Sequence, residues 1–150
     1  GGWSYDGILN CFSYTGWSVM SSNGIIFREK KLTFKDQTEI EYEQILFDTW
    51  AFRAMGNEDV IPDGSVNHLK FNRGEKPQQV FSNFGGLAIY KWDDVKNHEY
   101  GARRMDDGSV MCDHPFLHKQ IRQAGGNIFL NPSMITLYSP TEFSEEIEVE

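Results

Sequence analysis

Short apolar stretches separated by polar and glycine-containing segments recur along the chain. Runs of this length, bounded by residues that favour turns, are typical of β-strands in a partly buried sheet. The last two runs follow the clearest helix signal in the sequence, so that region is expected to be a helix that leads into a strand. The pattern predicts strands at residues 7–12, 24–28, 84–92, 127–130 and 134–138.

The clearest helix signal is the segment DHPFLHKQIRQAGG at residues 113–126. Asp113 or His114 would cap its start, Pro115 suits a first helical turn, and Gly125 suits the C-terminal cap. Apolar positions three and four apart give the helix one face for burial against a core. The side chains expected on that buried face are Leu117, Ile121 and Ala124.

Two weaker helices are predicted at residues 39–46 and 93–98, and residues 57–73, rich in Gly, Asp, Asn and Pro, are predicted to form a long loop. Loops of this length in compact domains are often functional. Strands interleaved with helices predict an α/β or α+β fold rather than an all-β sandwich. We expect one globular domain over residues 1–140, followed by a solvated acidic tail at 141–150.

Charge changes this picture mainly by excluding partners. The 150 residues contain 14 Lys and Arg against 22 Asp and Glu, a net charge of −8, and five of the Glu residues fall within Glu142 to Glu150. A protein that binds duplex nucleic acid or an anionic membrane needs clustered Lys and Arg, so neither partner is expected. The rest of the chain is closer to charge balance, which leaves a nucleotide or another anionic ligand open.

No apolar run approaches the length of a membrane span, and the first residues have neither the basic nor the apolar region of a signal peptide. Cys11 and Cys112 form no metal-binding pattern. The chain is therefore expected to be soluble, with the cytoplasm favoured over secretion and the compartment otherwise open.

An acid, an indole and a guanidinium lie close together in residues 47–53, FDTWAFR. If this segment is a strand, Asp48 and Trp50 share one face and Arg53 lies on the other. One interpretation is a core tryptophan flanked by exposed charges. The other is a ligand-binding wall, in which Arg53 neutralises an anion and Trp50 offers an apolar plate.

A glycine pair, Gly85 and Gly86, lies at the start of the strand predicted at residues 84–92. Paired glycines form a turn, or they let the backbone approach a ligand closely. Nothing local decides between these two interpretations.

Rings alternate with hydroxyl groups in residues 12–18, FSYTGWS, which include Trp17 and precede the polar run Ser21-Ser22-Asn23. Sugar-binding clefts use this mixture, because sugar rings offer both C–H faces and hydroxyl edges. Interior packing beside a polar loop explains the same pattern equally well.

Asp113 lies at the start of the helix predicted at residues 113–126. A carboxylate there is stabilised by free backbone N–H groups and the helix dipole, so it is either a simple cap or an oriented acid at the rim of a cleft, ready to accept a proton. His114 and His118 are four residues apart, but two histidines without a third ligand favour an ordinary surface pair over a metal site.

Taken in order, these segments resemble the C-terminal, acceptor-side part of a GT-A-fold glycosyltransferase of the kind found in microbes and large DNA viruses. The likeness covers about residues 3–138 and is carried by GWSYDGILNCF with GWSVMSSNG, FDTWAFRAMG, SNFGGLAIYKW and CDHPFLHKQIRQAGGNIFLNPSM. It implies part of a GT-A-like mixed sheet flanked by helices. It also implies a hexosyl- or pentosyltransferase that uses a UDP- or GDP-sugar donor and a glycan acceptor.

The resemblance also implies roles for particular residues. In such enzymes an acid near this helix start is the general base on the acceptor hydroxyl or orients it, and here that acid is Asp113. The glycine-bearing strand start lines the donor-sugar and acceptor site. The residues expected to bind substrate are Gly85, Gly86, Asp48, Trp50, Arg53, Trp17 and His114.

The sequence departs from the family in one important respect, because no D-x-D motif occurs in it. Enzymes of this kind use that motif to hold Mn²⁺ or Mg²⁺, which neutralises the leaving diphosphate. The N-terminal nucleotide-binding half of the fold is also missing. The resemblance therefore implies a metal cofactor whose ligands are not identified in this chain, and a domain that lacks its donor-binding half.

Two other functions stay open. A non-catalytic carbohydrate-binding module would keep the aromatic residues and give Asp113 no special role. A glycoside hydrolase would need a second carboxylate about 5–10 Å from Asp113, and Asp48 is the candidate for it.

Overall fold

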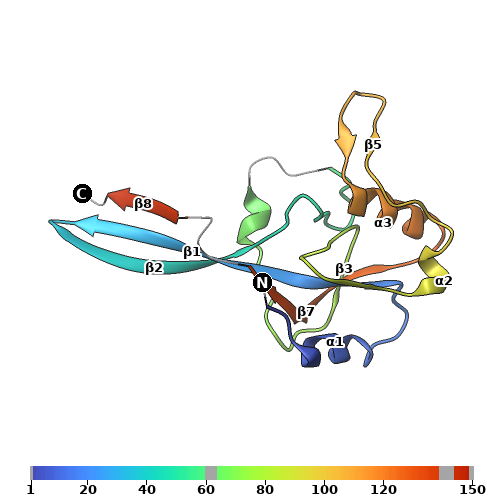
Figure 1. Cartoon of the computed structure of the whole chain (residues 1–150), viewed down its shortest axis with the longest axis horizontal. Helices are drawn as coiled ribbons and strands as arrows, with labels where there is room; N and C mark the ends of the chain where they lie inside the picture. The colour runs from blue at the N-terminus through green and yellow to red at the C-terminus, as the bar shows by residue number, and fades with distance from the viewer. Residues whose placement is uncertain (1, 60–63, 139–143, 149–150) are drawn as a thin grey trace.

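The computed structural model describes residues 2–59, 64–138 and 144–148 and shows a mixed α/β fold with a curled mixed sheet and few helices (Figure 1). This agrees with the predicted α/β or α+β class. The elements, in chain order, are α1 (Tyr5–Cys11), β1 (Val19–Phe34), β2 (Gln37–Leu46), the 3₁₀ helix η1 (Ser65–His68), β3 (Gln78–Val80), β4 (Ala88–Tyr90), α2 (Trp92–Val95), β5 (Arg103–Arg104), β6 (Val110–Met111), α3 (Asp113–Gln123), β7 (Ile128–Leu137) and β8 (Ser144–Glu148).

Strand β1 organises the six-stranded sheet, because different partners pair with its two halves. Its first half lies between antiparallel β4 and parallel β7, with Val19 opposite Tyr90 and Ile128. Its second half pairs with antiparallel β2 and parallel β8. The β1–β2 hairpin extends away from the rest of the molecule (Figure 1). Its turn, Lys35 and Asp36, has positive φ at both residues, as a type I′ hairpin turn requires.

Two apolar cores lie on opposite faces of the sheet, because successive side chains of a strand point to opposite sides. Val19 of β1 belongs to the core covered by α3, where Leu117 and Ile121 pack. Its neighbour Met20 belongs to the smaller core on the side of α1, with Cys11 and Met134. The sites described below lie around the start of α3.

Several predicted elements are wrong. Residues 7–12 lie mostly in α1, not in a strand, because the Ser4 side chain caps the helix by accepting the N–H of Gly7. Residues 39–46 form β2 instead of a helix: glutamates alternate with Ile40 and Tyr42, and this period of two is that of a strand. Residues 48–51 form a turn, so the two-faced arrangement considered for a strand at residues 47–53 does not apply.

Other predictions are confirmed in whole or in part. Residues 24–28 lie in β1, and the runs at 127–130 and 134–138 belong to one strand, β7. Of residues 84–92 only Ala88–Tyr90 is strand, and α2 is shorter than the helix predicted at 93–98. The loop predicted at 57–73 contains η1, and residues 60–63 lie outside the described residues.

The helix predicted from residue 113 is confirmed as α3, with two corrections. Its N-cap is Cys112, and Asp113 is the first helical residue instead of the cap. Leu117 and Ile121 are buried as expected, but Ala124 is exposed because it lies beyond the end of the helix.

The acidic tail lies partly outside the described residues, which include only 144–148 of it. These residues form β8, which pairs through its backbone with β1. The division into a domain and a tail stays a prediction. None of the helices in the described part of the chain has the length and hydrophobicity needed to cross a membrane, and the compartment stays a prediction.

Candidate functional site

Buried polar side chains of β1 fix the segment that carries the glycine pair. The Ser22 hydroxyl donates to the Gly85 carbonyl at 2.8 Å, and the Asn83 amide donates to the Ser22 carbonyl at 2.8 Å. Asn23 donates to the Phe71 carbonyl at 2.9 Å. These side chains are fully or almost fully buried. The polar run at residues 21–23 therefore serves interior packing and is not a sugar-binding surface.

The glycine pair is required by close packing within the protein. Gly85 has a φ of +66°, and a Cβ there would lie 2.2 Å from the Ser22 carbonyl oxygen. Gly86 has a φ of +98°, and its Cβ would lie 2.4 Å from the Tyr138 hydroxyl. Gly24 of β1 is constrained from the other side, since its Cβ would lie 2.9 Å from the Gly85 carbonyl oxygen. The close neighbours are residues of the same chain, so the interpretation of the pair as a backbone that approaches a ligand stays a prediction.

Asp113 lies beside this segment with both carboxylate oxygens in hydrogen bonds. The Tyr100 hydroxyl donates to Oδ2 at 2.6 Å, and the His114 backbone N–H donates to Oδ1 at 3.0 Å. The bond from Tyr100 is the main reason that the pKa of Asp113 lies below its usual value. The side chain stays 42% exposed. Asp113 is therefore ionised at neutral pH and accessible to a ligand.

Asp48 comes to the same place from the segment after β2, and its pKa is displaced in the opposite direction. Burial raises its pKa, and the charge of Asp113 adds to this, while His114 and the backbone N–H groups of Ala51 and Gly85 act in the other direction. Its φ of +65° is unusual for a residue outside a hairpin turn. The structure thus brings together two carboxylates with pKa values displaced in opposite directions.

His114 is held by aromatic side chains on two sides. Its ring stacks on Phe84 with centroids 4.1 Å apart, and the edge contact with Tyr100 has centroids 5.5 Å apart. Its Nδ1 lies 3.3 Å from Oδ1 of Asp113. We call Asp48, Tyr100, Asp113 and His114 the carboxylate cluster. It is built from three separate segments of the chain.

His118, one turn further along α3, has a structural role. Its Nδ1 lies 2.7 Å from the Ser82 hydroxyl and its Nε2 lies 2.8 Å from the Tyr90 hydroxyl. Burial lowers its pKa to about 3, with the nearby charge of His114 in second place. Both ring nitrogens are used inside the protein. The expectation of a surface pair is therefore wrong, because His118 is fully buried and the His114 side chain is only 16% exposed.

The state of His118 predicts how stability depends on pH. An unfolded chain protonates this histidine near its ordinary value, whereas the folded chain keeps it neutral. The free energy of unfolding should therefore fall on acidification from about pH 6.5, by about 1.4 kcal/mol for each pH unit. Urea unfolding at pH 7, 6 and 5 measures this slope. His98→Gln should leave the slope unchanged, and a flat profile would contradict the assignment.

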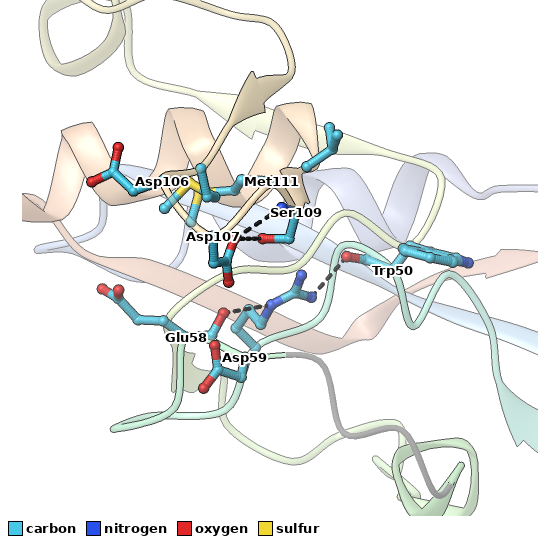
Figure 2. A pocket seen from close by; sticks show the side chains of 10 residues that line it. Trp50, Glu58, Asp59, Asp106, Asp107, Ser109 and Met111 are labelled. Atoms are coloured by element: carbon cyan, nitrogen blue, oxygen red, sulfur yellow. Dashed lines mark hydrogen bonds between the residues drawn. The ribbon is translucent and has the colours of Figure 1, made fainter.

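Next to the carboxylate cluster is a pocket of about 820 Å³, between the 50–59 segment and the β5–β6 hairpin (Figure 2). Trp50 is two residues from Asp48, and Met111 is two residues from Asp113. Two residues of chain span at most about 7 Å, so the backbone of the pocket wall begins close to both residues, although neither carboxylate lines the pocket. The lining residues are Trp50, Arg53, Glu58, Asp59, Met105, Asp106, Asp107, Ser109, Val110 and Met111.

Arg53 shapes this pocket from inside the wall. It is only 6% exposed. Its guanidinium donates to the backbone carbonyls of Glu58 at 2.9 Å, Trp50 at 2.7 Å and Phe52 at 2.8 Å. These bonds fix the turn that carries Trp50, which is 68% exposed. Trp50 lies at one edge of the pocket, and its indole extends away from Glu58 and Asp107 (Figure 2).

The residues predicted to bind substrate thus fall into three groups. Asp48, Gly85, Gly86, Asp113 and His114 meet at the carboxylate cluster, and Trp50 and Arg53 line the adjacent pocket. Trp17 lies apart from both, in the core on the α1 side. It is 4% exposed, donates to the Tyr14 carbonyl, and has the Lys91 ammonium 4.6 Å from its ring centroid.

Sequence reasoning missed three contributors to this region. Tyr100 lies in the segment between α2 and β5, and no local pattern connects it with Asp113. Asp106 and Asp107 are part of an ordinary hairpin-turn sequence, MDDGS, and become pocket residues only through the position of the hairpin. The turn signal could have located the hairpin, but it could not have shown which residues lie opposite the hairpin.

Removing the Tyr100 hydroxyl should change the acidity of Asp113. In Tyr100→Phe the carboxylate loses its strongest hydrogen bond, so the pKa of Asp113 should rise toward its usual value. Because a lowered folded-state pKa stabilises the protein above the unfolded pKa, the variant should lose stability at neutral pH and differ little from wild type in strong acid. An NMR titration of the Asp113 carboxyl measures the shift. Tyr42→Phe, exposed on β2, is the control, and equal pKa values in both variants would contradict the prediction.

No three His, Cys, Asp or Glu side chains converge as a metal site within the described residues. These residues do not on their own supply the ligand set that the resemblance implies, so the requirement for Mn²⁺ or Mg²⁺ stays a prediction. Comparison of the chain with protein-family models, curated proteins and solved structures gives no match. The function is therefore proposed from the chemistry of the site.

Proposed function

We propose that this chain takes part in glycosyl transfer from a nucleotide-sugar donor to a hydroxyl of a glycan acceptor, as the acceptor-binding part of a GT-A-like enzyme. The observation that carries the proposal is the position of ionised Asp113 beside a pocket large enough for a ligand of several hundred Å³. The residues meet there from distant parts of the sequence, as they do in functional sites. The resemblance in sequence is the second support.

In this reaction Asp113 is the general base. The acceptor oxygen forms a bond to the anomeric carbon, the bond from that carbon to the nucleoside diphosphate breaks, and the hydroxyl proton passes to Asp113. A carboxylate has about four lone-pair positions, so Asp113 can accept a substrate hydroxyl while it keeps its bonds from Tyr100 and His114. Attack assisted by such a base favours inversion at the anomeric carbon.

The donor is proposed to be a UDP- or GDP-sugar, with Mn²⁺ or Mg²⁺ as the cofactor that neutralises the leaving diphosphate. We assign no step to metal ligands in the described residues. Within the proposal, no donor site is assigned to the described residues, and the chain acts in the cytoplasm.

The test is a thermal-shift panel of UDP, GDP and their sugars, with and without Mn²⁺. It should use this chain and a longer chain that includes any residues encoded before Gly1. A site filled to 100 times its dissociation constant adds about 2.7 kcal/mol to stability. Metal-dependent stabilisation by one nucleotide, with transfer to a glycan in the same preparation, is the expected result. The absence of both in either chain would contradict the proposal.

A glycoside hydrolase is the second candidate, because the pKa of Asp48 is raised and that of Asp113 is lowered. Two carboxylates with pKa values displaced in opposite directions suit a general acid and a nucleophile or base. Asp48→Asn separates the two functions. It should abolish hydrolysis of an aryl glycoside in a hydrolase, but leave most of the transfer activity of an enzyme in which Asp113 is the base.

A further inference from the structure

The pocket beside the carboxylate cluster has a chemical character that restricts its ligand. Its floor and edge offer apolar surface from Trp50, Met105 and Met111. Its volume of about 820 Å³ exceeds what a single sugar ring needs and lies in the range of ordinary ligand sites. One indole ring, apolar methionine side chains and carboxylate acceptors in the same pocket match a hydroxyl-rich ligand with C–H faces. This combination fits an oligosaccharide of two or more units.

The charges around the pocket do not favour an anion. Arg53 is the single cation among the described lining residues, and its N–H groups are directed to backbone carbonyls inside the wall. Lys119 and Arg122 lie near the pocket, but both are paired with Glu58, at 3.1 and 3.3 Å. Arg104 of β5 donates to the Gly108 carbonyl at the hairpin turn.

The carboxylates on the hairpin side, by contrast, have no cation paired with them in the described part of the chain. Asp107 accepts the backbone N–H and the hydroxyl of Ser109, at 2.9 and 2.5 Å, which fixes its position without neutralising it. Asp106 lines the same space, whereas Asp59 lies on the opposite wall, where it interacts with the Arg53 guanidinium (Figure 2). A ligand in the pocket therefore meets fixed negative charge on one side.

We infer that this pocket binds an acceptor oligosaccharide that is neutral or carries amino groups, and that it rejects glycans bearing carboxylate or sulfate groups. That the oligosaccharide is an acceptor rests on the proposed function, but its binding does not depend on transfer. The carboxylates accept hydrogen bonds from hydroxyl or ammonium groups, and one ligand ring lies on the Trp50 indole. The same field keeps the nucleotide diphosphate out of this pocket.

The size of the discrimination follows from Coulomb's law. At about 7 Å in water, one ligand charge facing one carboxylate changes affinity roughly threefold. Asp106 and Asp107 together should therefore weaken an anionic disaccharide about tenfold relative to its neutral counterpart at low salt. Because both carboxylates are exposed, salt above the physiological range should reduce the difference.

The experiment measures binding to the 150-residue chain by NMR, through the Trp50 indole N–H signal. The probes are disaccharides of gluco, galacto and manno configuration, each in neutral, amino and uronic acid form. At least one neutral or amino disaccharide is expected to shift this signal, with the uronic form about tenfold weaker. Trp50→Ala should remove the binding, measured in that variant through the backbone amide signals of the pocket residues Asp107 and Ser109. A uronic form that binds as tightly as the neutral one, or no binding by any probe, would overturn the inference.

A matched pair of double variants isolates the charges. Asp106→Asn with Asp107→Asn should bring the uronic form to within about threefold of the neutral form, and asparagine at position 107 keeps the turn through its side-chain carbonyl. Asp93→Asn with Asp94→Asn on α2 changes the net charge equally and should keep the tenfold difference. An equal effect of both pairs would overturn the inference. Selective binding without any transfer activity would support this inference and contradict only the proposed glycosyl transfer.

Discussion

Asp113→Asn is expected to reduce the turnover of glycosyl transfer by about 10²–10⁴-fold, the usual contribution of a general base. The amide of asparagine cannot take the acceptor proton, yet its oxygen still accepts a hydrogen bond from Tyr100 or from the His114 N–H. The fold should therefore survive, with a stability change of about 1 kcal/mol. Initial rates at saturating donor and acceptor, together with urea unfolding, measure the two effects separately.

Asp93→Asn provides the control for this experiment. It removes one exposed carboxylate from α2 with the same change in charge and shape, and it should leave turnover unchanged. A decrease in turnover of less than tenfold in Asp113→Asn would show that Asp113 is not the general base. A large loss in Asp48→Asn instead would transfer that role to the buried carboxylate, whose raised pKa is closer to neutral pH.

Local signals predicted α3 and the glycine pair correctly, because both depend on neighbours in the sequence. Pro115 and Gly125 mark the ends of α3, where a fixed φ suits the first turn and a φ of +92° suits the residue after the helix. Gly85 and Gly86 were expected to allow an unusual backbone. What the pattern could not show is that the close neighbour is β1 of the same chain.

Asp48 and Arg53 show why the geometry of the site could not be predicted from the sequence. If their segment were a strand, the two charges would lie on opposite faces. Instead it turns at Asp48, and Arg53 holds the turn by donating to three carbonyls. Neither the turn nor the burial of the guanidinium follows from local propensity, because the segment is held by distant residues: Phe52 packs in the same core as Leu117 of α3. The expectation of an anion-binding Arg53 accordingly receives no support from its contacts.

Trp17 shows a second limit of prediction from the sequence. Its surroundings of rings and hydroxyls suited a sugar site and a core equally well, and only the pairing of β1 with β7 decides which face it occupies. Buried polar residues cause the same ambiguity. Ser22 and Asn83 have the composition of a polar surface, but their hydrogen bonds run to each other's segments across the sheet. A sequence without aligned relatives holds no direct record of such pairings.

Gly85→Ala should destabilise the protein by roughly 2–5 kcal/mol, the largest stability effect expected here. A positive φ costs an L-residue about 1–2 kcal/mol, and a methyl group forced against packed backbone costs typically 1–3 kcal/mol more. Both apply, because the new Cβ would lie 2.2 Å from the Ser22 carbonyl oxygen at a φ of +66°.

Gly108→Ala is the matched control for Gly85→Ala, and urea unfolding of the two variants separates the two costs. Gly108 has a φ of +86° in the hairpin turn, and its Cβ would meet nothing within 4 Å. It should therefore lose only about 1–2 kcal/mol, the cost of the backbone conformation. Equal losses in the two variants would show that the Gly85 segment yields without strain. In that case the segment would not be rigid enough to hold its backbone N–H against Asp48, and the pKa of that carboxyl would rise further, because this N–H acts to lower it.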